Sequence, residues 1–318
     1  MNTYLIPGIT QVWTGNFTFL VMASAFIRLL KDRLAINLYV ELVQRLRSWW
    51  IIYGIFTLIF IANARFFLVF LALISFLAFK EFVSIIPLRK DDRKAVLLAY
   101  VCIPFQYLWI SLGWHRVFIL FIPVFMFLLL QACLMTQGKS NNYLRSVASI
   151  YLGLMITVFS LSHIGILMNL HGTHGTGSNG ACLVIYLLLL TQFNDVSQYI
   201  WGKCLGKIKI IPEISPNKTQ AGFVGGIITT ILLSLLIAPV LTPFSPETSL
   251  FMGMLIAISG FFGDLSISAI KRDLGIKNTG TLLPGHGGIL DRVDSLTFTA
   301  PVFFHIYYYY STIPGFTL

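Results

Sequence analysis

Residues 222–242 read GFVGGIITTILLSLLIAPVLT, a run that contains no charged side chain. A helix of about 20 such residues is as long as the hydrocarbon core of a bilayer is thick. Runs of this kind recur along the chain, so the sequence predicts an all-α polytopic helical membrane protein with about 9–10 transmembrane helices. The candidate runs are 12–30, 49–63, 66–80, 95–113, 117–136, 144–169, 181–201, 222–242, 250–270 and 294–310. The second and third runs are short and could together form a re-entrant hairpin.

The composition of the chain excludes a soluble globular protein. Of its 318 residues, 57% are hydrophobic and 11% are charged, and the mean hydropathy is +0.82. A soluble domain carries roughly 25% charged residues, because its surface must be hydrated. The same composition excludes intrinsic disorder and a small disulfide-stabilised scaffold.

The basic residues indicate how the chain is oriented in the membrane. If the 31–48 loop is cytoplasmic, alternate loops must be cytoplasmic too, and 20 of the 22 Lys and Arg residues then lie on that side. Only Arg65 and Arg116 fall on the other side. The count predicts a multi-pass protein of the cytoplasmic (inner) membrane with both termini periplasmic or extracellular. The net charge of +10 therefore comes mostly from basic residues in the loops at the cytoplasmic surface of the membrane. Nucleic-acid binding is not expected.

The two halves of the chain differ in where their polar residues lie. We expect residues 1–180 to form N-terminal transmembrane helices with an interfacial helix near 34–48, where apolar and polar residues alternate at helical spacing. The stretch HGTHGTGSNG at 171–180 favours an external loop over a metal site. We identify no residue with a chemical role in this half. Residues 181–318 are expected to form a C-terminal transmembrane catalytic region.

Aspartates lie inside or at the ends of the apolar runs of this C-terminal region. A carboxylate at the centre of a membrane helix costs about 2.5–3.5 kcal/mol on insertion scales, so it needs a partner or a function. Asp264 is flanked by SGFFG and LSISAI, whereas Asp294 could simply cap the last helix. The residues concerned are Asp195, Asp264, Asp291 and Asp294.

Two polar stretches follow the first of these aspartates. Asp195 and Tyr199 are one helical turn apart and share a face, and Lys203 follows where the helix would meet the cytoplasm. Further on, Ser215-Pro-Asn-Lys218-Thr219 is typical of a turn that opens a helix. Backbone N–H groups there could bind an anion, or the segment could be only a capped helix start, and both interpretations remain open.

The third polar stretch runs from Gly263 to Asp294. Spacings of four and seven place Asp264, Ser268 and Lys271 on one stripe of a helix. A PGHGG turn, which lets the chain approach a ligand closely, then leads to Asp291 and Asp294. Carboxylates that converge among Lys and Arg at a membrane boundary are typical of a magnesium–nucleotide site.

These residues resemble the phosphatidate cytidylyltransferases, also called CDP-diglyceride synthetases. The C-terminal signature of that family is matched by Ser268-x2-Lys271-Arg272-x4-Lys277-Asn278-x-Gly280-x2-Leu283-Pro284-x-His286-Gly287-Gly288-Ile289-x-Asp291-Arg292-Val293-Asp294. Asn278 stands where the family has aspartate, which removes a negative charge. The resemblance covers about residues 190–300.

The resemblance implies an enzyme that makes CDP-diacylglycerol and pyrophosphate from CTP and membrane phosphatidate in phospholipid biosynthesis. It implies Mg²⁺ as cofactor, held by Asp264, Asp291 and Asp294, and it leaves a second cation and a homodimer open. The expected catalytic residues are Asp264, Lys271, Arg272, Asp291, Arg292 and Asp294. The expected binding residues for the phosphates of CTP and phosphatidate are Asp195, Tyr199, Lys203, Ser215, Lys218, Thr219, Ser268, Lys277, His286, Gly287 and Gly288.

Two other functions fit parts of the sequence. A CTP-dependent lipid kinase acting on polyprenol or phytol would use similar phosphoryl chemistry but would release a nucleoside diphosphate. A transporter or scramblase would use the buried aspartates as an ion path, and it predicts matching broken helices in both halves. We see no such repeat in the sequence.

Overall fold

The structure is a computed structural model, and it forms two compact units, Met1–Phe67 and Leu68–Leu318. In the first unit, helix α1 (Pro7–Leu29) is accompanied by Trp50, whose Nε1 donates to Ser24 Oγ at 3.1 Å. The expected interfacial helix near 34–48 and the expected span 49–63 lie almost wholly outside the described residues. Those residues are 7–29, 31, 39, 43, 46, 50, 54, 57, 64–136, 142–170, 180–280 and 287–312.

Seven helices in the described part of the chain are long and apolar enough to cross a membrane. Two of them contain a short π-helical stretch, η3 (Phe121–Met126) and η4 (Met155–Phe159). A further apolar helix, α13 (Leu296–Thr312), has 17 residues. The seven are α3 (Ala64–Ile85), α4 (Arg93–Ser111), α5 (His115–Leu120) continued by η3 and α6 (Phe127–Met135), α7 (Tyr143–Leu154) continued by η4 and α8 (Ser160–Asn169), α9 (Gly180–Leu205), α10 (Gln220–Leu241) and α11 (Pro246–Asp273).

The all-α polytopic architecture is thus confirmed. Over the described residues no strand forms, and only an isolated antiparallel bridge joins Lys209 to Thr219. The third run differs from its expected limits, because α3 continues past Lys80 and Glu81 to Ile85 and is 22 residues long. It is therefore not a short half of a hairpin. Placing its end at the first charged residues was wrong, since Glu81 is buried inside the protein.

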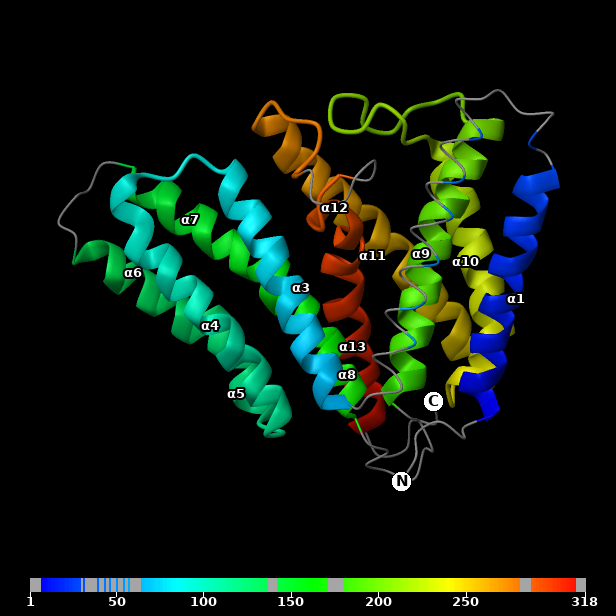
Figure 1. The fold of residues 1–318 in the computed structure, drawn as a ribbon, viewed down its shortest axis with the longest axis horizontal. Helices are drawn as coiled ribbons and strands as arrows, with labels where there is room; N and C mark the ends of the chain where they lie inside the picture. Colours follow the sequence, from blue (N-terminus) through cyan, green and yellow to red (C-terminus); the bar gives the residue numbers. More distant parts are fainter. Residues whose placement is uncertain are drawn as a thin grey trace. The chain divides into compact units, whose positions relative to one another are not determined.

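Within the unit Leu68–Leu318, helices from both halves of the chain pack together. Helices α9, α10 and α11 pack on one another, α13 lies against α8, α9 and α11, and α8 also contacts α4 (Figure 1). Small and polar residues allow this packing in a lipid environment. Asn194 of α9, for example, accepts from Thr230 of α10 at 3.3 Å and donates to the carbonyl of Ala257 in α11 at 3.2 Å.

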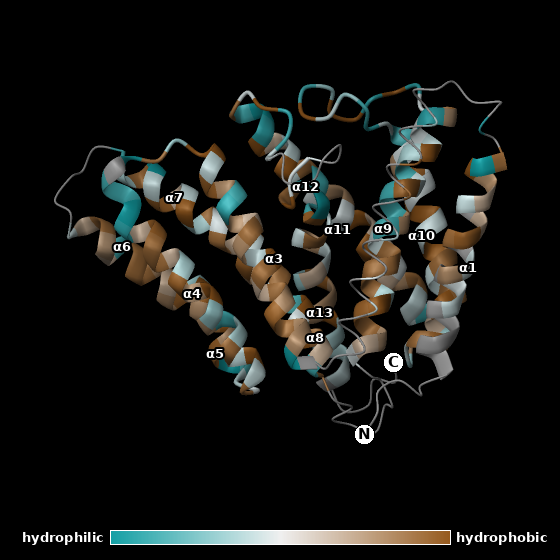
Figure 2. Cartoon of the chain, viewed as in Figure 1, coloured by the Kyte–Doolittle hydropathy of each residue, from teal (hydrophilic) through white to brown (hydrophobic). Residues whose placement is uncertain are grey.

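The polar connections of this unit gather at one end. The connections that follow α3, α9 and α11 lie at the same end in Figure 1, and Figure 2 shows hydrophilic residues concentrated there. This is the arrangement that the distribution of Lys and Arg predicts for alternating helices. Which side of a membrane this end faces, and where the termini lie, stay predictions.

Candidate active site

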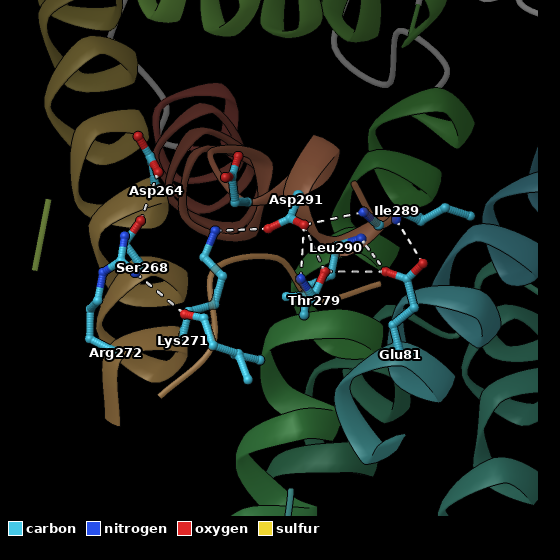
Figure 3. Close-up of polar contacts among 12 residues, drawn as sticks. Glu81, Asp264, Ser268, Lys271, Arg272, Thr279, Ile289, Leu290 and Asp291 are labelled. Carbon is cyan, nitrogen blue, oxygen red and sulfur yellow. Dashed lines mark hydrogen bonds and ion pairs between the residues drawn. The ribbon is translucent and has the colours of Figure 1, made fainter. Parts of the chain in front are cut away.

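An ion pair between Lys218 and Asp264 lies where α9, α10 and α11 meet. Lys218, just before α10, places Nζ 2.7 Å from Asp264 Oδ2, and the two side chains are 17% and 25% exposed. Lys218 also donates to Gln198 Oε1 on α9 at 2.9 Å. Ser268 Oγ, one turn after Asp264, donates to Asp264 Oδ1 at 3.2 Å (Figure 3). Asp264 and Ser268 therefore share a helix face, as their spacing predicts.

Two further aspartates stand beside Asp264, and we call Asp195, Asp264 and Asp294 the carboxylate cluster. Ser295 links two of them, because its Oγ donates to both carboxylate oxygens of Asp195 at 3.1 and 2.9 Å and its backbone N–H donates to Asp294 Oδ1 at 2.8 Å. The three carboxylates are close enough to interact electrostatically. Burial, followed by repulsion from Asp264 and Asp195, raises the pKa of Asp294 well above that of an ordinary aspartate.

The close approach of α11 to Asp294 requires a glycine. A Cβ atom on Gly263 would lie 2.7 Å from the carbonyl oxygen of Asp294 and 2.9 Å from that of Ser295. Because both are backbone atoms, any larger residue would push α11 away from the start of α13. Gly263 therefore sets the separation of Asp264 from Asp294.

Asp291 lies in a different environment, in which all its partners are hydrogen-bond donors. Lys271 Nζ donates to Oδ1 at 2.8 Å, and these side chains are 12% and 10% exposed. Oδ2 accepts from the backbone N–H and the hydroxyl of Thr279, both at 3.0 Å, and from the N–H of Gly288 at 3.1 Å. Burial disfavours the charged form, but these donors outweigh it and hold the pKa of Asp291 below its usual value.

Glu81 of α3 extends this second group from the other half of the chain (Figure 3). The side chain is buried, and its oxygens accept from the backbone N–H groups of Ile289 and Leu290, each at 2.9 Å. The Thr279 hydroxyl lies 3.4 Å from Glu81 Oε2, so it stands between the carboxylates of Glu81 and Asp291. We call Glu81, Thr279, Asp291 and Lys271 the loop clamp.

Our expectation that the first 180 residues contribute no chemistry-bearing residue missed Glu81. The apolar run expected at 66–80 ends just before this residue. The overlooked signal is that the apolar run continues after it, as Phe82, Val83, Ser84, Ile85. It is the same signal, an acid within an apolar segment, that singled out Asp264.

The glycines of the predicted turn lie against protein carboxylates. Gly287 has φ +81°, and a Cβ there would be 2.8 Å from Asp291 Oδ2. A Cβ on Gly288 would collide with Glu81 Oε2 and would lie 2.5 Å from the Thr279 hydroxyl. Gly287 and Gly288 therefore lie close to Asp291 and Glu81, and an approach of the turn to a ligand stays a prediction.

The other expected catalytic and binding residues differ in their surroundings. Tyr199 is 61% exposed, and its ring is 5.8 Å from Lys203 Nζ. Within the described ranges, neither residue forms a hydrogen bond or ion pair with the carboxylate cluster or the loop clamp. Arg272 is exposed and donates to the carbonyl of Ile214 at 3.2 Å. Lys277 and Arg292 are exposed, and His286 lies outside the described residues.

The segment before α10 contains both a helix cap and a residue that contacts the carboxylate cluster. Thr219 is the N-cap of α10, and its hydroxyl accepts from the backbone N–H of Gly222 at 3.1 Å. This is the capped helix start that the sequence allowed. Ser215 is partly exposed, and its N–H donates to the carbonyl of Ile211 at 3.0 Å. Lys218 is the residue of this segment that reaches the carboxylate cluster.

The predicted metal ligands do not converge as a set of three. Among the described residues, no three or more His, Cys, Asp and Glu side chains are arranged to hold a metal ion. Asp291 is engaged by the loop clamp, whereas Asp264 and Asp294 present hard oxygen donors that repel each other. Mg²⁺ in nucleotide sites takes one or two carboxylates and completes its shell with water and phosphate oxygens. The pair Asp264 and Asp294 fits that requirement.

Comparisons with known proteins find relatives of this chain. Residues 43–310 match the cytidylyltransferase family. The uncharacterized protein YnbB of Escherichia coli K12 is 44% identical over 293 residues, which cover 92% of this chain and 96% of that protein. The phosphatidate cytidylyltransferases of Staphylococcus haemolyticus and Staphylococcus saprophyticus are 40% and 39% identical over 135 and 148 residues. Those two alignments cover 41% and 46% of this chain and 50% and 55% of the relatives.

Proposed function

The chain belongs to the cytidylyltransferase family, and from this premise we propose that it transfers the cytidylyl group of CTP to phosphatidate. An anionic oxygen of the phosphatidate phosphate attacks the α-phosphorus of CTP. The bond from that phosphorus to the oxygen of the β-phosphate breaks, and pyrophosphate leaves with its electron pair. The products are CDP-diacylglycerol and pyrophosphate. The names of the staphylococcal relatives support this choice of acceptor.

The observation that carries the proposal is the contact between Lys218 and the carboxylate cluster. Phosphatidate is already anionic, so the reaction needs positioning and charge neutralisation and no strong general base. We expect Lys218, Lys271, Arg272 and Arg292 to hold the triphosphate and the lipid phosphate. Asp264 and Asp291 orient the two lysines, since each accepts directly from one ammonium group.

We further propose that Asp264 and Asp294 hold Mg²⁺, with Ser268 keeping the Asp264 carboxylate in place. When bound, the ion would neutralise negative charge on the triphosphate. Asp264 and Asp294 belong to a cluster of carboxylates that repel one another. This repulsion supports the assignment, because a divalent cation would relieve it. Whether a second cation takes part stays open.

The position of the site suits a lipid substrate and a water-soluble one. Asp195 and Asp264 lie in the halves of α9 and α11 nearest the polar end of the unit, where Asp294 also begins the return into α13 (Figure 1). Phosphatidate can reach this depth within a bilayer, and CTP can enter from the polar end. The distribution of Lys and Arg supports a cytoplasmic site in the inner membrane.

The test is transfer by the purified protein in detergent micelles that contain phosphatidate, Mg²⁺ and CTP labelled in either the α- or the γ-phosphate. We expect α-label in the lipid and γ-label in pyrophosphate, in equal amounts. A CTP-dependent kinase would place the γ-label in the lipid and release CDP. That result, or the absence of labelled lipid, would refute the proposal.

A further inference from the structure

The structure points to Glu81 as a positioning residue for this reaction. We propose that its carboxylate, on α3, holds Thr279, Gly280 and residues 287–294 in the arrangement that the transfer requires. The inference rests on the proposed function, and it gives the N-terminal helices a part in the site. It goes beyond the sequence signature, which contains no residue of α3.

Among the described residues, the side-chain hydrogen bonds of Glu81 are made to this one segment. The side chain is 7% exposed and accepts from the N–H groups of Ile289 and Leu290 at the beginning of α12 (Leu290–Val293). Across the described ranges, no Lys, Arg or His side chain pairs with it. Its charge is therefore balanced by donors of the segment it holds, and these N–H groups have their partner in Glu81.

Two glycines of the segment, Gly280 and Gly288, lie against this carboxylate. A Cβ atom on Gly280 would lie 3.1 Å from Glu81 Oε1 and 3.2 Å from Glu81 Cδ, and its three nearest atoms all belong to Glu81. Gly288 lies against the other oxygen, where a Cβ would collide. Glycines on both sides of residues 281–287 thus leave the space that the glutamate fills.

A continuous series of contacts connects Glu81 with the proposed catalytic groups. The Thr279 hydroxyl stands between Glu81 and Asp291, and Asp291 holds Lys271 of α11 at 2.8 Å. Asp294 follows Asp291 by one helical turn and belongs to the carboxylate cluster. Loss of the Glu81 carboxylate should therefore displace Lys271 and Asp294, although Glu81 touches no reacting group itself.

The main test compares Glu81→Gln with Glu213→Gln, a matched change of an exposed glutamate in the connection between α9 and α10. The introduced glutamine has nearly the same shape as the glutamate but can accept only one of the two backbone N–H groups. We expect kcat to fall at least tenfold and the KM for CTP to rise, because the displaced Lys271 is a cation expected to hold phosphate. Glu213→Gln should match the wild type. Unchanged kcat in Glu81→Gln would overturn the inference.

A second measurement does not depend on activity. Lys277 precedes the held segment, Arg292 lies within it, and both are exposed, so trypsin should cleave there faster in Glu81→Gln than in the wild type. Equal cleavage rates would contradict the inference. If the wild-type protein transfers no cytidylyl group, the proposed function fails, and the cleavage rates still decide whether Glu81 holds the segment.

A further pair of variants covers the case in which Glu81→Gln does not fold. Gly280→Ala should lower kcat, because its new methyl group presses on the Glu81 carboxylate. The aspartate in Glu81→Asp is one methylene shorter and leaves more space. In that variant, Gly280→Ala should therefore lower kcat by a smaller factor. An equal cost of Gly280→Ala in both backgrounds would show that Glu81 does not transmit the effect.

Discussion

The carboxylate cluster and the loop clamp both contain buried acidic residues, but the surroundings of these acids differ. Hydrogen-bond donors surround the acids of the clamp, whereas the acids of the cluster lie near one another. In the clamp, Asp291 and Glu81 are surrounded by N–H, hydroxyl and ammonium donors, so their charges are stabilised within the protein. In the cluster, three carboxylates interact with one another, and Lys218 forms an ion pair with Asp264. The carboxylates of the clamp are therefore matched by donors of the protein itself, whereas the cluster is the group that we propose to bind the cation. Asp291 and Asp294 are three residues apart and belong to different groups.

The largest effect should follow from Asp264→Asn. This change removes a cluster charge, the partner of Lys218 and a proposed metal ligand together, so we expect transfer activity to fall roughly 10²–10³-fold. Asp273→Asn, at the exposed end of the same helix, is the control. Activity within twofold of the wild type in Asp264→Asn would remove this residue from the site.

Lys218→Gln should have the next largest effect. It leaves Asp264 without its ammonium partner and removes a cation expected to bind phosphate, so we predict a loss of roughly 10–100-fold. The KM for CTP should rise, because the lost charge acts on the bound nucleotide. Lys207→Gln, an exposed residue of the nearby connection, should leave both parameters unchanged. An unaltered KM and kcat in Lys218→Gln would contradict its assignment.

Thr279→Val tests the loop clamp and should have a smaller effect on activity. The change removes the hydroxyl between Glu81 and Asp291 and keeps the backbone N–H that Asp291 accepts. A hydrogen bond to a charged group contributes about 1.5–3 kcal/mol, part of which the remaining donors should retain. We expect kcat to fall roughly three- to tenfold, and Thr279→Ser to restore it. Failure of serine to restore kcat would show that the hydroxyl is not what matters.

The smallest effect on activity should come from Asp92→Asn, which lies outside both groups. Asp92 is fully buried and accepts from Arg89 Nη2 and from Ser146 Oγ, each at 2.8 Å. Burial disfavours its charge, but these donors prevail and lower the pKa of Asp92. We expect the variant to keep its kcat while losing about 1–3 kcal/mol of stability in detergent.

The pH dependence of this contribution has a definite sign. Because the folded pKa of Asp92 lies below the unfolded value of about 3.9, its contribution is complete above that pH. It is lost as the pH falls through the lower, folded pKa. Thermal unfolding should therefore show a smaller wild-type advantage over Asp92→Asn in strong acid than at neutral pH. A constant difference in unfolding temperature would contradict this account.

The sequence predicts the parts of the fold that depend on local pattern. Uninterrupted apolar runs such as 222–242 locate the spanning helices, and the spacing of Asp264 and Ser268 places them on one face. Helix ends are less certain, since α3 continues through Lys80 and Glu81. A charged residue ends a run only if it meets water, and local pattern does not reveal burial against a distant segment.

The partners of the acidic residues could not be predicted for the same reason. Glu81 meets Ile289 and Leu290 more than 200 positions along the chain. Asp291 and Asp294 are only three residues apart in the signature, but the fold gives them different partners. Asp291 accepts from Thr279 and Gly288, whereas Asp294 belongs to the carboxylate cluster. A sequence pattern therefore identifies the acidic residues, but tertiary contacts determine which partners each of them has.

The division between cluster and clamp is tested most directly by cation binding. Mn²⁺, a paramagnetic substitute for Mg²⁺, can be titrated against purified protein and CTP while electron paramagnetic resonance reports the free ion. We predict that Asp264→Asn binds Mn²⁺ at least tenfold more weakly than the wild type, and that Asp291→Asn loses less affinity, because it removes no proposed ligand and only shifts Asp294. Loss of binding in Asp291→Asn, with binding retained in Asp264→Asn, would contradict the account.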